Sequence, residues 1–476
     1  MKSPILGGAY TASSINVADN RCINLFSEPV LEGSESPAYL QRCPGLRLLA
    51  NIGNGPIRGM WAFQSNTNKS FVLSGNSLYR IDKSWNATLV GTVTGVGPVS
   101  IADNGRQLFI ASDVDSYIYD DVNQVLSRIT DVDFSGAVTV GFLDGFFVFN
   151  QPNSQRLWVT ALNDGTSIDA LDFSSAEGAP DNIVGIVVDH REVWVFGENS
   201  VEVWYNAGNA DFPLSRIQGA FNEIGCAAKY SISRLDNGLF WLAKDARGKG
   251  MVYRANGYTG QRISTHSIET EIQKYSDISD AIGYTYQQNG HSFYVLTFPT
   301  ANKTWCFDVA TGLWHERASW SDGNFTRHRG ACQMSFNNEI VIGDYQNGKI
   351  YAFDLTRHRD DTGIQKYLRS WKALSSGQND YRRTAHHSLQ LHCETGSIQT
   401  NVEPQIMLRW SDDSGHTWSN EHWANMGKIG EYFNRVIWRR LGMTLKLRDR
   451  IYEISGTDEN SIYITGAEIK ISATSS

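Results

Sequence analysis

A weak internal repeat is the feature that most constrains how this chain can fold. Each copy has a turn rich in Asp, Asn and Gly, an apolar strand, a second turn, and an aromatic strand that ends in Asp or Asn. In one copy Asp103-Asn104-Gly105 precedes the apolar run 108–111, and the aromatic run 117–120 follows. A unit that recurs in this way indicates a repeat architecture.

Seven copies can be anchored at the first residue of the apolar strand. The anchors are Phe71, Leu108, Phe146, Val193, Leu239, Phe293 and Ile340, at spacings of 37, 38, 47, 46, 54 and 47 residues. A four-stranded propeller blade takes about 40–50 residues, and strands packed between blades are apolar on both faces, as 193–196 is. We therefore predict an all-β fold with a β-propeller of six or seven blades over residues 51–355. A long chain of β-sandwiches is the rival architecture.

One stretch inside the repeats predicts a helix. Ile268, Ile272 and Tyr275 recur at helical spacing, and Ser264 or Thr265 is the expected N-cap. We expect a surface helix that packs on the propeller through these apolar residues.

The two ends of the chain lie outside the repeats. Residues 1–50 are loop-like and predict an N-terminal arm, and residues 356–385 are rich in Lys and Arg and predict a basic connector. Strand patterns return in residues 386–476, which predicts an antiparallel, sandwich-like platform domain. The arm has too few periodic strands to fold alone, so we expect it to pack with the platform.

The platform contains an Asp-box, the pattern Ser-x-Asp-x-Gly-x-Thr-Trp. Its residues are Ser411, Asp413, Gly415, Thr417 and Trp418. We expect a structural role, because Asp413 can accept backbone N–H groups of a hairpin turn, Gly415 supplies an unusual φ, and Trp418 packs beneath. The neighbouring pair Asp412-Asp413 is expected to be solvated. The motif is common in sialidases, so a carbohydrate-active propeller, either a glycosidase or a lectin, is the alternative function.

Charge and motif content exclude several other classes. The chain has 42 basic and 50 acidic residues, a net charge of −8, and residues 1–354 alone carry −10. A surface of that sign does not coat DNA. No apolar run is long enough for a membrane helix, and the N-terminus lacks the apolar segment of a signal peptide. No nucleotide-binding, hydrolase or metal-ligand spacing is present, so we predict no catalytic, cofactor-binding or metal-binding residues.

The cysteines and histidines are expected to be structural or solvated. The six cysteines form no CxxC pair and are expected to be reduced, and nothing specifically supports a Cys22–Cys43 disulfide. His386-His387 and His392 are expected to be solvated or interface histidines rather than metal ligands.

A basic segment follows the Asp-box. Its six cations within 16 residues are Arg435, Arg439, Arg440, Lys446, Arg448 and Arg450, and Asp449 is the single acid among them. We favour a subunit or adaptor interface for this candidate assembly segment. A solvated face and a DNA-facing surface are the alternatives.

Several segments, in order along the chain, resemble the packaged-DNA stabilisation proteins of short-tailed bacteriophages, which form the tail nozzle and close the head. The segments are 21–28, Leu40 with Pro44-Gly45-Leu46, 263–269, 304–316, the Asp-box and 435–442. The matches extend from about residue 21 to residue 469, and Cys22 and Cys43 depart from the family pattern.

The resemblance implies a structural virion protein of the tail, made in the host cytoplasm and without catalytic residues. It implies a six-fold ring below the portal and adaptor rings that stabilises the packaged DNA and provides the channel for genome ejection. The implied partners are other copies of the chain, the portal or adaptor protein, a tail spike or fibre, a needle or plug, and genomic DNA that passes without sequence-specific binding.

Overall fold

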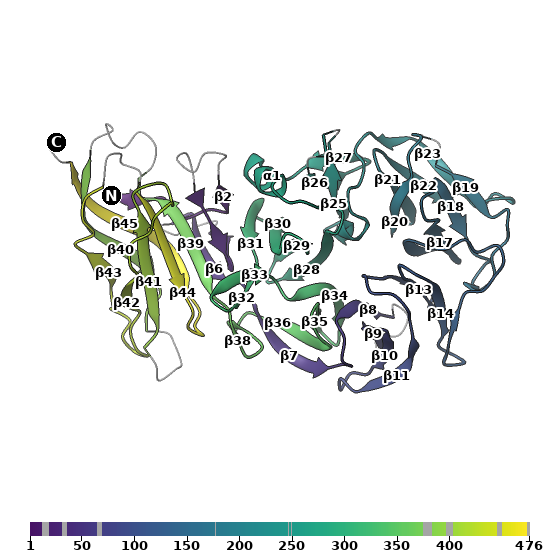
Figure 1. The fold of residues 1–476 in the computed structure, drawn as a ribbon, viewed down its shortest axis with the longest axis horizontal. Coiled ribbons are helices and arrows are strands. Elements are labelled where there is room, and N and C mark those ends of the chain that lie inside the picture. Colours follow the sequence, from purple (N-terminus) through teal and green to yellow (C-terminus); the bar gives the residue numbers. More distant parts are fainter. Residues whose placement is uncertain are drawn as a thin grey trace.

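The computed structural model describes residues 1–11, 19–30, 36–63, 69–176, 178–245, 247–248, 250–374, 383–396, 403–444 and 450–473. Strands dominate these ranges, and they form a propeller and a platform that lie side by side along the longest axis of the molecule (Figure 1). No helix in the described ranges is long and apolar enough to cross a membrane.

Each of the first five blades is a four-stranded antiparallel sheet of consecutive strands. Blade one contains β8 (Ile57–Ala62), β9 (Ser70–Ser74), β10 (Ser77–Ile81) and β11 (Ala87–Thr92). Blade two contains β12 (Ser100–Asp103), β13 (Gln107–Ala111), β14 (Ser116–Asp120) and β15 (Val125–Arg128). Blade three contains β16 (Val140–Leu143), β17 (Phe146–Asn150), β18 (Arg156–Val159) and β19 (Phe173–Ser175). Blade four contains β20 (Ile183–Asp189), β21 (Glu192–Gly197), β22 (Val201–Asn206) and β23 (Leu214–Asn222). Blade five contains β24 (Ser233–Leu235), β25 (Gly238–Lys244), β26 (Gly250–Asn256) and β27 (Thr259–Arg262).

The last two blades complete the circle. Blade six contains β28 (Ile282–Gln288), β29 (His291–Phe298), β30 (Lys303–Asp308) and β31 (Leu313–Glu316). Blade seven contains β34 (Gly330–Phe336), β35 (Glu339–Asp344), β36 (Lys349–Asp354) and β7 (Gly45–Asn51). Because β7 pairs antiparallel with β36, with Gly45 opposite Asp354, backbone hydrogen bonds join the first and last strands of the propeller. The described part of the chain therefore contains seven blades, which resolves the choice between six and seven.

All seven anchor residues lie in the second strand of a blade, as the repeat predicts. These strands are β9, β13, β17, β21, β25, β29 and β35. Both of their faces are buried because aromatic side chains of successive blades meet, as Phe71 meets Tyr119 and Phe109 meets Phe147 at centroid distances of 5.1 and 5.6 Å. The first hairpin of blade three turns at Asp144 and Gly145, whose φ values of 48° and 97° explain the Asp-Gly sequence there.

The predicted helix is present as α1 (His266–Ile272), between blades five and six. The hydroxyl of Thr265 accepts a hydrogen bond from the N–H of Ile268, so Thr265 is the N-cap. Ile268 and Ile272 are fully buried against the propeller, which confirms their expected role.

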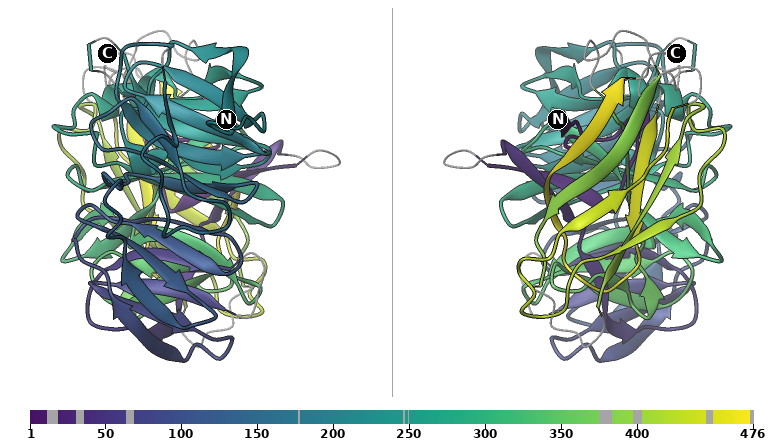
Figure 2. Two further views of the ribbon diagram at one scale, coloured as in Figure 1. Left: turned by 90° about the vertical axis from the view of Figure 1, so that its right-hand side faces the viewer. Right: turned by 90° about the vertical axis from the view of Figure 1, so that its left-hand side faces the viewer.

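The platform is a sandwich of two sheets that the right-hand view of Figure 2 shows in front of the propeller. The first sheet contains β43 (Val436–Arg439), β40 (Thr384–Cys393), β45 (Tyr463–Ala473), β6 (Ala38–Arg42), β5 (Leu25–Pro29) and, on β45, β1 (Lys2–Ser3). The second contains β4 (Cys22–Ile23), β39 (Tyr367–Lys372), β44 (Ile451–Gly456), β41 (Gln405–Ser411) and β42 (His422–Asn425). Trp371, Trp438 and Tyr452 lie in the core between them.

The second platform sheet is continuous with blade six. β31 pairs in parallel with β4 at Glu316 and Ile23, and β4 pairs antiparallel with β39, so one nine-stranded sheet extends from the propeller into the platform. Three short hairpins lie outside the main sheets or at their edges. They are β2 (Tyr10–Thr11) with β3 (Asp19–Asn20), β32 (Ala318–Ser321) with β33 (Asn324–Arg327), and β37 (Arg359–Asp360) with β38 (Gly363–Ile364).

Two of the domain boundaries predicted from the sequence differ from those in the structure. The propeller begins at Gly45 rather than at residue 51, because β7 is the outer strand of blade seven. The range 356–385 is more than a connector, because β39 lies inside it and is a buried strand of the platform. The charge of Arg369 in the middle of β39 hides the apolar pattern of that strand in the sequence.

Candidate functional site

The Asp-box forms a closed hairpin turn after β41. The Asp413 carboxylate accepts hydrogen bonds from the N–H of Thr417 (2.8 Å), the hydroxyl of Thr417 (2.6 Å) and the hydroxyl of Ser411 (2.7 Å). These hydrogen bonds lower the pKa of Asp413 from its usual value to about 2, and the bond from the Thr417 side chain has the largest effect. Gly415 has a φ of 87°, and the Trp418 indole N–H donates to its carbonyl (3.1 Å). Both Asp413 oxygens are thus used within the turn.

Asp412 is not solvated as the sequence suggests, because it forms an ion pair with buried Arg450. The Nε and Nη2 atoms of Arg450 each lie 2.7 Å from an oxygen of Asp412, and Nη1 donates to the carbonyl of Leu441 (2.6 Å). The bidentate geometry gives this pair both strength and direction. Arg450 therefore belongs to the interior of the platform and is not available for an assembly contact.

The other cations of the basic segment lie at the edge strand β43 or outside the described residues. Arg439 and Arg440 are exposed, and Arg435 is exposed and donates to the side-chain oxygen of Gln390. Lys446 and Arg448 lie outside the described residues. The structure thus brings Arg435, Arg439 and Arg440 together on one edge of the platform and separates Arg450 from them.

Two buried arginines that the sequence did not single out fasten the arm to the platform. Arg369 in β39 donates to the carbonyls of Ile5 (2.7 Å) and Gly8 (3.0 Å), and Arg42 in β6 donates to those of Gln365 (2.6 Å) and Asn460 (2.9 Å). Burial lowers the pKa of Arg42 to about 10. Their acceptors are backbone carbonyls from distant parts of the chain, so no local sequence signal could have found them.

A buried histidine links the arm to the propeller. His291 at the start of β29 lies between Asp308 (Nδ1 to Oδ2, 2.9 Å) and Glu28 of β5 (Nε2 to Oε2, 2.6 Å). Asp308, followed by Glu28, raises the pKa of His291 to about 9, so the imidazole is protonated at neutral pH. This ionic bridge joins the first platform sheet to blade six.

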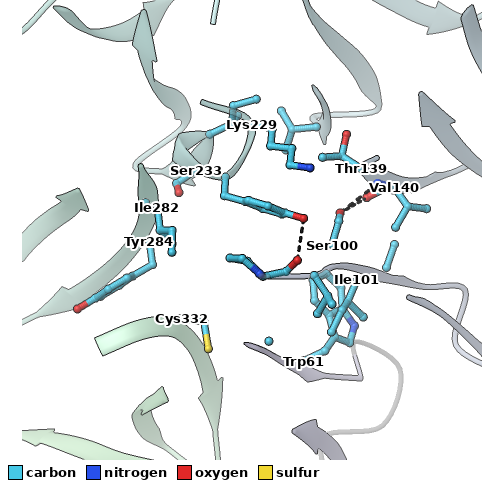
Figure 3. Close-up of a pocket in the computed structure, with 18 of the residues that line it drawn as sticks. Trp61, Ser100, Ile101, Thr139, Val140, Lys229, Ser233, Ile282, Tyr284 and Cys332 are labelled. Atoms are coloured by element: carbon cyan, nitrogen blue, oxygen red, sulfur yellow. Dashed lines mark hydrogen bonds between the residues drawn. The ribbon is translucent and has the colours of Figure 1, made fainter. Parts of the chain in front are cut away.

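The first strands of the blades surround a central cavity of about 1160 Å³. Tyr230, in the 3₁₀ helix η1 (Lys229–Ser231) that follows blade four, lines the cavity and donates a hydrogen bond to the carbonyl of Pro98 (2.8 Å). Its neighbour Lys229 lines the same cavity (Figure 3). The lining mixes cations such as Lys229 with carboxylates such as Asp103, so charge alone selects no ligand. In the described ranges no group of three or more His, Cys, Asp or Glu side chains is placed to hold a metal ion.

The six cysteines are free thiols, including the pair Cys22 and Cys43, and four of the six are buried. The fold defines a class of protein in which a β-propeller and a β-sandwich share one continuous sheet.

Two family models match this architecture in order. Residues 1–358 match "Bacteriophage P22 Gp10, beta-propeller", and residues 374–472 match "Bacteriophage P22 Gp10, beta-sandwich". The chain belongs to this bacteriophage family and is a structural tail protein, a component of the virion. The predicted family and the predicted fold are confirmed.

The chain is also similar to several solved structures, at low sequence identity. The N-terminal domain of Nup159 matches at 9% identity and a TM-score of 0.40, over 68% of this chain and 97% of that one. The extracellular domain of the putative hybrid two component system BT4673 from B. thetaiotaomicron matches at 12% identity and a TM-score of 0.45, over 86% of this chain and 58% of that one. YCF48 bound to D1 peptide matches at 11% identity and a TM-score of 0.41, over 68% and 97%. No curated protein matches the chain.

Proposed function

We propose that six copies of this chain form the ring-shaped tail nozzle below the portal and adaptor rings, where the ring stabilises the packaged DNA. The observation that carries the proposal is the ordered match of both family models, over residues 1–358 and 374–472. The ring provides the channel for genome ejection and the attachment points for tail spikes or fibres and for a needle or plug.

The physical character of the chain supports this role. The nine-stranded sheet that joins blade six to the platform couples the two parts through backbone hydrogen bonds. Such coupling suits a subunit that must resist mechanical stress. Residues 1–354 carry a net charge of −10, which repels the phosphate backbone. Genomic DNA then slides through the ring without sequence-specific binding.

The platform is the part that we assign to docking on the portal or adaptor. The N-terminal arm contributes β1, β5 and β6 to its first sheet, and Arg435, Arg439 and Arg440 lie exposed along β43. Exposed charges of this kind contribute little stability to the chain itself and serve to orient a partner. We assign them to assembly rather than to DNA contact.

We assign the Asp-box a structural role and the chain no catalytic one. Thr417 and Ser411 occupy both oxygens of Asp413 with hydrogen bonds inside the turn. A glycan-release assay on the purified chain tests the carbohydrate-active alternative, and the expected result is no released sugar. Release that disappears in Asp413→Ala would favour that alternative.

Genome retention tests the proposed function directly. Phage heads assembled without this chain should leak or expose their DNA, and addition of the purified full chain should restore protection against nuclease. A chain that lacks residues 1–43 keeps β7 and the propeller but loses the arm strands, so it should fail to restore protection. Equal protection with and without the full chain would contradict the proposal.

A further inference from the structure

The central cavity of the propeller has room for a small organic molecule. Its volume is about 1160 Å³, and pockets for small ligands commonly measure about 300–1,000 Å³. Its wall includes the buried apolar side chains of Ile101, Val140 and Ile186. In pockets of this kind an apolar wall holds the body of a ligand, and a few polar groups fix its orientation.

Five cations and four carboxylates line this cavity, and contacts within the chain hold four of the five cations. Two cations form ion pairs with lining carboxylates, namely Arg58 with Asp113 (3.4 Å) and Arg191 with Asp144 (2.8 Å). Arg234 donates a hydrogen bond to the carbonyl of Val188 (2.9 Å). Arg327 lies over the ring of Tyr345, 3.6 Å from its centroid. The fifth cation is Lys229.

Lys229 in η1 has no partner of opposite charge. In the part of the chain that the structure describes, no carboxylate forms a salt bridge with it, and Asp113, which faces it, is paired with Arg58. The ammonium group lies 4.9 Å from the ring centroid of Tyr230. Burial lowers the pKa of Lys229, and the charge of Asp113 only partly opposes this effect. The site therefore stabilises the ammonium charge incompletely, and an anion bound beside it would supply the missing partner.

Apolar surface adjoins this ammonium group. The hydroxyl of Tyr230 donates to the carbonyl of Pro98 (2.8 Å), which joins η1 to the loop before blade two. Val96 in the same loop also lines the cavity and is 87% exposed. Figure 3 shows the side chain of Lys229 pointing into the cavity. A cation beside an aromatic ring and an exposed valine matches a ligand that has an acid group and an apolar body.

The surrounding charge favours a ligand with a single acid group. Residues 1–354 carry a net charge of −10, and Asp113 lies near Lys229. Repulsion from this field grows with the negative charge of the ligand. Nucleic acids and other polyanions are therefore poor ligands for the cavity.

We propose that the central cavity binds a small organic anion, whose acid group pairs with Lys229 and whose apolar body lies against Tyr230 and Ile101. Carboxylates and sulfonates that carry an apolar ring or chain form the expected class of ligand. Because the hydrogen bond from Tyr230 to Pro98 already holds the site in shape, little conformational entropy is lost on binding. This site does not depend on the tail ring, since every residue in it belongs to the propeller of one chain.

Two fluorescent probes that differ in charge test the role of Lys229. Anilinonaphthalenesulfonate carries a sulfonate on apolar rings, and N-phenylnaphthylamine has the same rings without the sulfonate. We expect the purified full chain to bind one molecule of the sulfonate probe. Lys229→Met should weaken that binding about tenfold, because it removes a charge-assisted contact. The neutral probe should bind the wild type and the variant equally.

Two further variants separate the charge of Lys229 from its effect on folding. Lys229→Arg keeps the cation and should retain most of the affinity for the sulfonate probe. Lys83→Met, at an exposed turn of blade one, is the matched control and should bind the probe as the wild type does. Because Lys229 forms no ion pair, Lys229→Met should keep the melting temperature of the wild type. Equal affinity of the sulfonate probe for the wild type and Lys229→Met, or no saturable binding to the wild type, would overturn the proposal.

Photolabelling locates the bound probe, because anilinonaphthalenesulfonate also binds exposed apolar surfaces. An azide derivative should label peptides that contain residues 96–101, 139–142 or 229–233, and excess unmodified probe should prevent the labelling. Label confined to other segments, such as that of the exposed Tyr432 and Phe433 in the platform, would overturn the proposal. Neither result bears on the tail ring, which the genome-retention assay tests separately.

Discussion

The propeller and the platform differ in how far apart in the sequence their paired strands lie. Each of the first six blades is formed by consecutive strands, and only β7 of blade seven comes from elsewhere in the chain. The first platform sheet, by contrast, pairs β1 at residues 2–3 directly with β45 at residues 467–468, and its other strands come from segments between these two in the sequence. The propeller can therefore form from local contacts, whereas the platform requires both ends of the chain to meet.

The forces that hold the two regions differ in the same way. Apolar second strands packed face to face stabilise the propeller. The platform has an apolar core as well, but buried Arg42 and Arg369 also bind backbone carbonyls of distant segments. The propeller also contains a buried arginine, Arg58, but its carbonyl acceptors at Gly97 and Val93 lie within 39 residues of it.

Removal of the arm should have the largest effect and should separate the two regions. Without residues 1–43 the platform loses β1, β4, β5 and β6, including the buried side chains of Ile5, Leu25 and Leu40. We expect the platform to unfold and the propeller to remain folded, as monitored by hydrogen exchange of each region. A deletion of residues 1–51 also removes β7 and should open blade seven. Similar exchange patterns in the two deletions would show that β7 does not close the propeller.

Replacement of a buried arginine should affect the two regions differently. Arg369→Met leaves the carbonyls of Ile5 and Gly8 without donors, and we expect the platform to lose about 3 kcal/mol of unfolding free energy. The matched variant is Arg58→Met, because Arg58 is a buried arginine of blade one that donates to the carbonyl of Gly97 (2.7 Å). Its effect should stay within blades one and two. Urea unfolding monitored by hydrogen exchange measures the stability of each region in both variants. A platform whose stability is unchanged in Arg369→Met would contradict the role of Arg369 in fastening the arm.

The His291 bridge between the two regions should depend on pH. Its pKa is raised from 6.5 to about 9, so its contribution is fully present below pH 6.5 and is lost as the pH rises through about 9. His291→Gln should therefore lower stability by about 3 kcal/mol at pH 6 and by little at pH 10. The exposed His190, which pairs with Asp189 in a propeller turn, gives a control variant that should change stability little at either pH. Thermal unfolding across this range is the measurement, and a pH-independent loss in His291→Gln would contradict the ionic bridge.

The smallest effect is expected at two matched surface turns. Asp413→Ala removes the acceptor for Thr417 in the platform, and Asp82→Ala removes the acceptor for the N–H groups of Ser84 and Asn86 in blade one. Both carboxylates are solvent-accessible, so each change should lower the melting temperature by no more than about 3 °C. A much larger loss for Asp413→Ala would mean that the Asp-box organises more of the platform than its own hairpin.

The sequence predicts the propeller better than the platform for physical reasons. Each blade is encoded in one continuous segment, so Asp-Gly turns and doubly apolar strands such as 193–196 are visible locally. The platform is built from segments that are distant in the sequence, so its strand pairs leave no local pattern. One of its strands, β39, carries the charged Arg369, whose acceptors at Ile5 and Gly8 lie more than 360 residues away. The Asp-box was visible because its hydrogen bonds are local. The burial of Arg450 was not, because Asp412 lies 38 residues from it.

A reconstruction of the tail vertex of the phage particle, with this chain present and absent, tests the central claim most directly. We expect six copies in one ring below the adaptor, each a seven-bladed propeller with its platform, and a vertex without that ring when the chain is missing. An unchanged ring in particles that lack the chain, or density for the chain elsewhere in the virion, would contradict it.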